Sequence, residues 1–245
     1  MNELHAQLTI PAEGWPPPWP LLLEVAQSSQ ANTWTLVGGM MVQIHTRLAG
    51  TDPHRTTNDI DLLLDLMPRQ ASVVSVVGDL TALGFTTQEP SWPNAPFHRL
   101  RRHDDVIDLL VPDHLPKHHH PRMLGRTIMP IDGGAQALTR LMNVDLLQGD
   151  LHTTITTPDL LGALVLKAAA SVTDNLDPAR HERDAALLAS LITDHATQLT
   201  RLHGSDRRRL RALTTRLADP YHPAWVSLQD AQAQRGQDTL RILTS

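Results

Sequence analysis

Apolar residues follow two different periods along the chain, and the change between them divides the chain into two parts. Up to about residue 157, short apolar runs alternate with polar stretches rich in proline and glycine, which is typical of strands joined by turns. From residue 158 onward, apolar residues recur every three to four positions, which is typical of amphipathic helices. The pattern predicts an α+β protein, with a mixed β-sheet domain over residues 1–157 and a helical domain over residues 158–245.

Individual elements can be predicted from the same pattern. Two hairpins are expected, one around the turn-prone residues 103–105 and one around residues 148–150. A short polyproline arm, residues 15–20, precedes the first helix. The expected strands are 33–37, 58–66, 97–101, 106–111, 127–131, 138–147 and 151–156, and the expected helices are 21–28, 40–48, 69–83, 158–172, 178–195, 206–218 and 228–243.

Composition narrows the setting in which the protein acts. The 245 residues include no cysteine, which excludes disulfides, zinc–thiolate sites and thiol catalysis and favours an intracellular protein. No window approaches the ~20 apolar residues that span a bilayer, and the N-terminus lacks a basic segment followed by an apolar one. We therefore expect a cytoplasmic protein without a membrane partner. A net charge of −5 argues against a globally basic nucleic-acid coat and leaves room for a local basic patch.

Two aspartates stand at the start of an apolar strand. Asp59 and Asp61 are two positions apart, so their side chains point to the same face. Two carboxylates held this close repel each other, and burial beside residues 62–64 increases the repulsion. Mg²⁺ fits between them, because this ion is usually bound by one or two carboxylates together with substrate phosphates. The alternative is an exposed strand end with two solvated aspartates.

A third carboxylate, Asp108, interrupts the apolar run 106–111. Unpaired buried carboxylates are rare, so Asp108 is expected to contact a cation or a metal ion. If its strand neighbours that of Asp59 and Asp61, the three carboxylates converge into a two-metal site that can hold a nucleotide's phosphates and activate an attacking oxygen. The competing interpretation pairs Asp108 with Arg101 or Arg102 across the hairpin.

Gly38 and Gly39 lie between a predicted strand and a predicted helix. A glycine pair at such a junction indicates a sharp turn or the close approach of another group. Free N–H groups at a helix start can bind phosphate oxygens, helped by the helix dipole. Arg55 and Thr57 could add a positive charge and a hydroxyl to the same phosphates.

The helical part places two charges on apolar faces. Lys167 is the sole charge in the run 160–172 and lies on the apolar stripe of Leu160 and Leu164. Asp184 lies on an apolar face of the next predicted helix. The two residues either form an inter-helix ion pair, or Lys167 binds a triphosphate while Asp184 orients it or acts as a base.

Three further charged stretches carry weaker signals. Residues 117–120, Lys-His-His-His, lie in a proline-bounded loop without an element that fixes ligand geometry, so a solvated loop or adventitious metal binding is expected. The basic groups at residues 98–102 and 207–211 are expected to be solvated faces. If the protein acts on RNA, they are the first places to expect phosphate contacts.

Taken in order, these motifs resemble the AbiEii/AbiGii-type nucleotidyltransferase toxins of the DNA polymerase β-like superfamily, which include MenT-like proteins. The resemblance spans about residues 30–192 and depends on the order of the motifs. They are the strand before Gly38-Gly39, the Arg55-x-Thr57-x-Asp59-Ile60-Asp61 stretch, Lys167 and Arg183-Asp184. It implies a nucleotidyltransferase fold followed by a helical domain, an active site in the cleft and Mg²⁺-dependent transfer from an NTP. It also implies tRNA 3′ ends as acceptor and a separately encoded antitoxin.

The resemblance assigns roles to the candidate residues. It implies that the metal ions bind Asp59 and Asp61, that the triphosphate binds Lys167, and that Asp184 is catalytic, while Gly38 and Gly39 hold phosphates. The chain departs from the family in a long loop between residues 39 and 59 and in having Arg183-Asp184 in place of a lysine-aspartate pair.

Three hypotheses follow from these residues. The first is Mg²⁺-dependent transfer of a nucleoside monophosphate from an NTP to an RNA 3′ hydroxyl, with release of pyrophosphate. The second keeps the fold and changes the acceptor to a small molecule or a protein hydroxyl. The third is a catalytically idle nucleotide-binding or interaction module that keeps the fold, for example as part of a toxin–antitoxin complex. An acidic cleft would favour a cationic small-molecule acceptor, and a basic rim would favour RNA.

Overall fold

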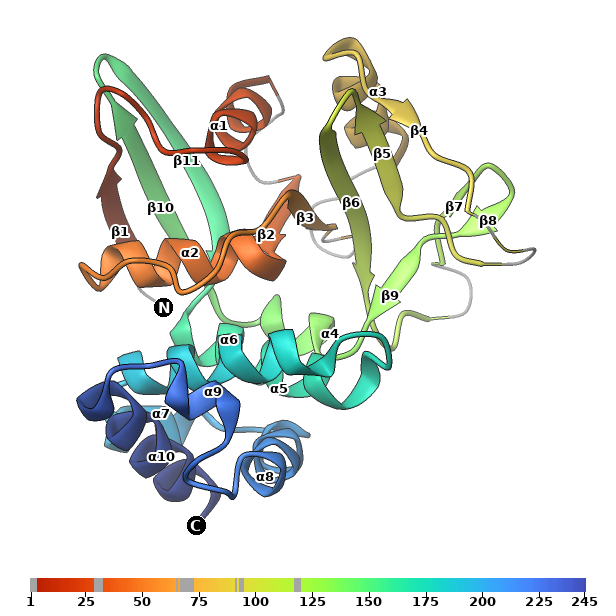
Figure 1. The fold of residues 1–245 in the computed structure, drawn as a ribbon. Coiled ribbons are helices and arrows are strands. Elements are labelled where there is room, and N and C mark those ends of the chain that lie inside the picture. Colours follow the sequence, from red (N-terminus) through yellow and green to blue (C-terminus); the bar gives the residue numbers. More distant parts are fainter. Residues whose placement is uncertain are drawn as a thin grey trace.

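The chain folds into a β-rich lobe and a helical lobe, which Figure 1 shows one above the other. The computed structural model describes residues 4–28, 33–64, 66, 73–90, 92, 95–116 and 120–245. Mixed sheets form most of the first lobe and helices form the second, so the predicted α+β class is confirmed. The division into two domains after residue 157 stays a prediction.

The described elements are, in chain order, β1 (Leu4–Thr9), α1 (Trp19–Ser28), β2 (Trp34–Val37), α2 (Gly38–Leu48), β3 (Asp59–Leu64), α3 (Val73–Ala82), β4 (Thr86–Thr87), β5 (Arg99–Arg102), β6 (Asp105–Pro112), β7 (Arg122–Met123), β8 (Arg126–Thr127), β9 (Met129–Ile131), α4 (Gly134–Ala137), β10 (Leu141–Gln148), β11 (Leu151–Pro158), α5 (Leu160–Thr173), α6 (Pro178–Leu191), α7 (His195–Arg201), α8 (Asp206–Arg216), α9 (Pro223–Val226) and α10 (Asp230–Thr244).

The largest sheet positions the candidate site. Its strand order is β2-β3-β6-β5-β4, and β9 pairs with β6. β3 and β6 are parallel neighbours whose apolar runs are buried on both faces. Leu62 packs into a core with α1 and α3, whereas Leu63 and Leu110 pack into a second core with the helical lobe. Side chains alternate along β3, so Asp59, Asp61 and Leu63 lie on the face opposite to Leu62 and face the helical lobe.

A smaller sheet pairs the N-terminus with a hairpin from the middle of the chain. The hairpin of β10 and β11 is antiparallel and turns at residues 149–150, as predicted. β1 was not predicted, and it pairs in parallel with β10, from Leu4 beside Met142 to Thr9 beside Leu147. A parallel partner this far along the chain leaves no turn signal in the local sequence.

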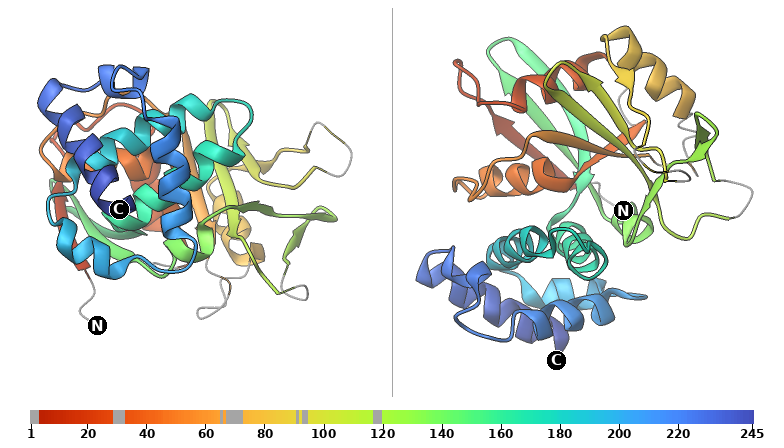
Figure 2. Two further views of the ribbon diagram at one scale, coloured as in Figure 1. Left: turned by 90° about the horizontal axis from the view of Figure 1, so that it is seen from below. Right: turned by 45° about the vertical axis from the view of Figure 1, so that its right-hand side comes forward.

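The helical lobe is built around α5 and α6. α5 and α6 share an apolar core with α8 and α10, and Figure 2 shows these helices stacked on one side of the sheets. Trp225 is buried among them, and its indole N–H donates to the carbonyl of Leu217 at 3.0 Å. Gly236 permits this packing, since an added Cβ would lie 2.7 Å from the Trp225 ring. Within the described ranges, no helix is long and apolar enough to cross a bilayer.

Several predicted boundaries differ from the structure. The helix predicted over 178–195 ends at Leu191, because Asp194 accepts from the Thr197 N–H at 3.0 Å and caps a separate helix, α7. The strand predicted over 138–147 begins at Leu141, after the short helix α4, and the strand predicted over 127–131 is divided between β8 and β9. The helix predicted over 21–28 starts at Trp19, within the predicted proline-rich arm.

Some predictions fall partly outside the described residues. The helix predicted over 69–83 is described only from residue 73, where α3 begins. Residues 117–119 of the histidine-rich stretch also lie outside the described ranges, and His120 is exposed.

Candidate functional site

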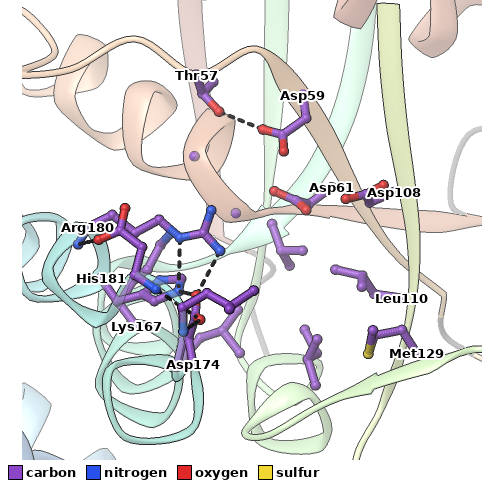
Figure 3. Close-up of a pocket in the computed structure, with 18 of the residues that line it drawn as sticks. Thr57, Asp59, Asp61, Asp108, Leu110, Met129, Lys167, Asp174, Arg180 and His181 are labelled. Atoms are coloured by element: carbon purple, nitrogen blue, oxygen red, sulfur yellow. Dashed lines mark hydrogen bonds and ion pairs between the residues drawn. The ribbon is translucent and has the colours of Figure 1, made fainter. Parts of the chain in front are cut away.

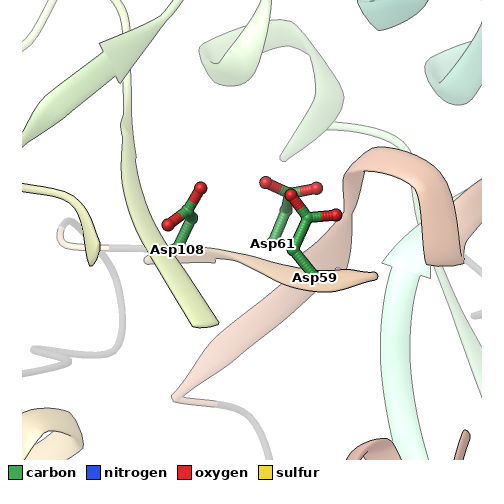
Figure 4. A group of neighbouring side chains, drawn as sticks. All are labelled: Asp59, Asp61 and Asp108. Atoms are coloured by element: carbon green, nitrogen blue, oxygen red, sulfur yellow. The ribbon is translucent and has the colours of Figure 1, made fainter. Parts of the chain in front are cut away.

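Three carboxylates converge on the face of the large sheet that looks toward the helical lobe. Asp59 and Asp61 alternate on β3, and Asp61 is the register partner of Asp108 on the parallel strand β6. Each side chain offers one oxygen, and these oxygens lie within 4.8 Å of one another. Figure 4 shows the three side chains on their neighbouring strands. The two strands are neighbours, which is the condition that the three-carboxylate interpretation requires, and the three residues could hold a metal ion.

Electrostatics indicates that negative charge is crowded around Asp61. Burial, together with the negative charges of Asp59 and Asp108, raises the pKa of Asp61 to about 7, although the positive charge of Lys167 opposes this rise. A carboxyl group that stays partly protonated at neutral pH is one that a cation would ionise. Hard carboxylate oxygens at this spacing fit a divalent ion such as Mg²⁺.

Asp108 also forms an ion pair across the β5–β6 hairpin. Arg99 donates from Nε and Nη2 to the two Asp108 oxygens at 2.8 and 2.7 Å. The predicted partners, Arg101 and Arg102, were wrong. The register places Arg99 opposite Asp108 and Arg101 opposite Val106.

Arg102 instead lies on the opposite face of β5. It contacts Glu24, with N–O distances of 2.7 and 2.6 Å, and Asp105 at 2.9 Å. The alternation of side chains along the strand thus separates it from the carboxylate cluster.

The glycine pair permits the close approach that the sequence indicated, and the groups that approach are the side chains of Asp61 and Thr57. α2 begins at Gly38, two residues before the predicted start, and Gly38 has a φ of +67°. An added Cβ on Gly38 would lie 1.6 Å from Oδ2 of Asp61, and one on Gly39 would lie 2.5 Å from Oγ1 of Thr57. Thr57 in turn donates to Oδ1 of Asp59 at 2.8 Å. The glycines therefore let the carboxylate cluster sit against the first turn of α2.

The first turn of α2 also faces the cleft, where its free N–H groups can bind an anion. The N-cap residue is Val37, whose side chain cannot accept a hydrogen bond from the first-turn N–H groups. Gly38 and Gly39 both line the cleft. The helix dipole favours negative charge at this position.

A buried ion-pair network lies on the opposite wall. Lys167 Nζ is 2.7 Å from Oδ2 of Asp184, and Arg55 donates to both Asp184 oxygens at 2.8 and 2.7 Å. The ion-pair interpretation is confirmed. Burial alone would raise the pKa of Asp184, but Lys167 and Arg55 outweigh it and hold that pKa well below its usual value. Asp184 is therefore fully ionised and bound by two cations. This state suits a residue that positions Lys167 and Arg55 better than one that transfers a proton.

The loop between α5 and α6 adds residues that the sequence analysis missed. Asp174 accepts hydrogen bonds from Arg180 Nη2 at 2.8 Å, from His181 Nε2 at 2.9 Å and from the Leu176 N–H at 2.8 Å. Burial and the positive charge of Lys167 lower the pKa of His181 to about 4, so this histidine is neutral at pH 7. The available signal was the pair of basic residues in the first turn of α6, directly after the Asp177-Pro178 helix start.

These groups line one cleft of about 1080 Å³. Figure 3 shows Asp59, Asp61 and Asp108 at one side and the side chains of Lys167, Arg180 and His181 at another. The lining also includes apolar side chains, among them Leu110, Met129 and Leu166. Every predicted site residue lines this cleft except Asp184, which is buried behind Lys167. The arrangement can hold a cation with its carboxylates and an anion with its basic groups.

Comparisons with known proteins add little to this geometry. No family model matches the chain, and no curated protein matches it. Among solved structures, the fold is similar to that of an antigenic nucleotidyltransferase-like protein from Paracoccidioides brasiliensis, at 13% identity, over 82% of this chain and 88% of that one, with a TM-score of 0.48. At this distance the likeness carries no argument about activity, so the proposal below depends on the site itself.

Proposed function

We propose that the cleft catalyses metal-dependent nucleotidyl transfer from an NTP to a 3′ hydroxyl of RNA, with tRNA as the first candidate acceptor. The observation that carries the proposal is that three carboxylates within 4.8 Å of one another share a cleft with Arg55, Lys167 and Arg180. A phosphoryl-transfer site needs this combination, because it binds a divalent ion and the negative charge of a triphosphate side by side.

The carboxylates provide the metal-binding half of the site. When bound to Asp59, Asp61 and Asp108, Mg²⁺ would neutralise phosphate charge and favour ionisation of the attacking hydroxyl. Thr57 fixes Asp59 by its hydrogen bond, and the first turn of α2 fixes Asp61 by close packing. The carboxylate geometry is therefore set before any ligand binds.

The basic wall provides the phosphate-binding half. Lys167 and Arg55 are held by Asp184, and Arg180 is held by Asp174. Their positive charges, with the N–H groups of Gly38 and Gly39, would bind the triphosphate and orient its α-phosphorus toward the carboxylates.

The reaction balances as a single displacement. The acceptor oxygen forms a bond to the α-phosphorus, the bond from that phosphorus to the oxygen bridging the β-phosphate breaks, and pyrophosphate leaves. The proton of the acceptor hydroxyl passes to the carboxylate cluster and then to water. The product is the acceptor extended by one nucleoside monophosphate.

The biological role follows from the family resemblance of the sequence. We propose that the protein is the toxin of a toxin–antitoxin pair, that its partner is the cognate antitoxin, and that it acts in the cytoplasm, where NTPs and tRNA occur. Growth arrest on expression of the wild-type chain, absent for the Asp59→Ala/Asp61→Ala variant, would support this role. Equal growth with both chains would contradict it.

The proposed reaction is tested by incubating the protein with each α-labelled NTP, Mg²⁺ and total tRNA. We expect label in the tRNA band with the wild type and none with Asp59→Ala/Asp61→Ala or with excess EDTA. The matched control is Asp219→Ala/Asp230→Ala, which changes two exposed aspartates of the helical lobe and should leave labelling intact. Label that enters tRNA equally with the cluster variant would contradict the proposal.

A further inference from the structure

A second cationic surface lies on the far side of the carboxylate cluster from the basic wall of Lys167 and Arg180. Figure 3 shows Asp108, Leu110 and Met129 on the side of the cleft away from Lys167 and Arg180. The strand next to Asp108 is β5, which carries arginines at residues 99, 101 and 102. Positive charge therefore flanks the carboxylates on two sides.

The alternation of side chains along β5 places these arginines on different faces of the sheet. Arg99 and Arg101 are two positions apart, so both share the face that carries Asp108, whereas Arg102 points to the other face and is paired with Glu24 and Asp105. Arg99 and the preceding residue, His98, line the cleft. We call His98, Arg99 and Arg101 the β5 strip.

The strip has unused positive charge. Arg101 is exposed, and its guanidinium makes no hydrogen bond or ion pair with the described part of the chain, although its backbone pairs within the sheet. Arg99 uses Nε and Nη2 for Asp108, and its Nη1 makes no hydrogen bond to any described residue. Arg99 can therefore contact an anion while it still holds Asp108.

The other basic group, residues 207–211, is largely occupied. Arg207 and Arg211 donate to carbonyls at the C-terminal end of α10, at 3.3 to 3.4 Å, and Arg209 is paired with Asp113 at 3.1 Å. Of the two basic groups, only the β5 strip has members that line the cleft, His98 and Arg99, and Arg101 adds a positive charge on the same face of β5 as Arg99. Arg208 is exposed, and it belongs to the other basic group and does not line the cleft, which makes it a useful control.

We propose that the β5 strip binds the phosphate backbone of a single-stranded polynucleotide and delivers its 3′ end to the cleft beside Asp108. This inference rests on the proposed function and gives the acceptor a docking surface. A triphosphate needs one cationic wall, and a second cationic surface suits a second polyanion.

The geometry also favours a single strand. Arg99 and Arg101 are spaced about 7 Å apart along an extended strand, so they can contact successive phosphates of an extended chain. The reacting end must enter the cleft to reach Asp108, and paired bases would obstruct this entry.

The test measures binding of a fluorescein-labelled single-stranded RNA of twelve nucleotides to the full chain, by anisotropy at a series of KCl concentrations. We expect Arg101→Ala to weaken binding by roughly tenfold and to reduce the slope of log Kd against log salt by about 0.7, the loss of one phosphate contact. Arg101→Lys should restore most of the slope. Arg208→Ala should match the wild type, and a blunt duplex of the same sequence should bind the wild type more weakly.

Two results would overturn the inference: the same affinity and slope for Arg101→Ala and the wild type, or wild-type binding of the duplex as tight as that of the single strand. Binding of a Mg²⁺-NTP analogue to the same preparations separates this failure from failure of the proposed function. If the analogue binds and Arg101→Ala has the same RNA affinity as the wild type, only the proposed docking surface is wrong. If the analogue does not bind at all, the proposed function fails with it.

Discussion

Asp61 and Asp108 are register partners on two parallel strands, so the sheet itself brings their carboxylates together. Their oxygens, with that of Asp59, lie within 4.8 Å of one another. Burial and mutual repulsion among these groups raise the pKa of Asp61 to about 7. Holding three carboxylates this close lowers the stability of the fold, and a bound cation would offset this loss. The destabilisation therefore links the cluster to its proposed role in metal binding.

The Asp61→Asn variant should be more stable than the wild type in metal-free buffer at pH 8. The folded-state pKa of Asp61 is raised from 3.8 to about 7, so the folded protein binds the proton more tightly than the unfolded chain. Its contribution therefore destabilises the fold progressively as the pH rises through this window and is constant above it. We expect a gain of ~1–2 kcal/mol at pH 8 that vanishes near pH 4. Urea titrations at both pH values measure it, and a loss of stability at pH 8 would make Asp61 a structural residue.

Mg²⁺ affinity should depend on pH through the same carboxyl group. Below pH 7 the ion must displace the proton of Asp61, so affinity should fall by up to roughly tenfold per pH unit between pH 7 and pH 5. Above pH 8 it should be flat. Calorimetric titration of Mg²⁺ in buffers of different ionisation enthalpy would also detect the released proton. A pH-independent affinity would mean that Asp61 is not a ligand.

Gly38→Ala should disrupt the cluster, beyond the strain of its backbone. Gly38 and Gly50 both have positive φ, +67° and +70°, but an added Cβ meets Asp61 Oδ2 at 1.6 Å only at Gly38, and nothing within 4 Å at Gly50. Gly50→Ala should therefore cost about 1 kcal/mol from φ alone. Gly38→Ala should cost more and should also abolish the rise in Tm that Mg²⁺ gives the wild type. Thermal melts with and without Mg²⁺ compare the two variants, and equal losses with retained Mg²⁺ response would refute the close-contact explanation.

Asp184→Asn should weaken both stability and nucleotide binding. It leaves Lys167 without its 2.7 Å partner in a buried site, which typically costs ~3–5 kcal/mol. A matched control is Glu182→Gln, also a buried acid on α6, whose partner is Arg216 at 2.6 Å, away from the cleft. Both variants should unfold at lower urea concentration. Only Asp184→Asn should raise the Kd for a Mg²⁺-NTP analogue, since it alone releases Lys167 and Arg55. Equal Kd values for the two variants would limit Asp184 to a structural role.

The sequence predicted those parts of the site that depend on local spacing. Asp59 and Asp61 share a face because they are two residues apart on a strand, and Asp108 could be recognised as a charge in an apolar run. Lys167 and Asp184 could be recognised in the same way, as lone charges on apolar helix faces. Local periodicity is enough for such inferences.

Other parts depend on register and long-range pairing, which spacing does not specify. The partner of Asp108 is Arg99 and not Arg101 or Arg102, because the turn at residues 103–104 sets the β5–β6 register. β1 was missed because its parallel partner β10 lies more than 130 residues away. The steric purpose of Gly38 is visible only when Asp61, on another element, is placed against it.

The central claim is that the carboxylate cluster and the basic wall form a single Mg²⁺-NTP site, and calorimetry tests it most directly. Each of the four NTPs, as a non-hydrolysable α,β-methylene analogue, is titrated into the wild type, Asp59→Asn/Asp61→Asn and Lys167→Ala, with Mg²⁺ or with EDTA. We expect at least one analogue to bind the wild type only with Mg²⁺, and both variants to lose that Mg²⁺-dependent binding. Wild-type binding that is equally tight with Mg²⁺ and with EDTA, or absent for all four analogues, would contradict the claim.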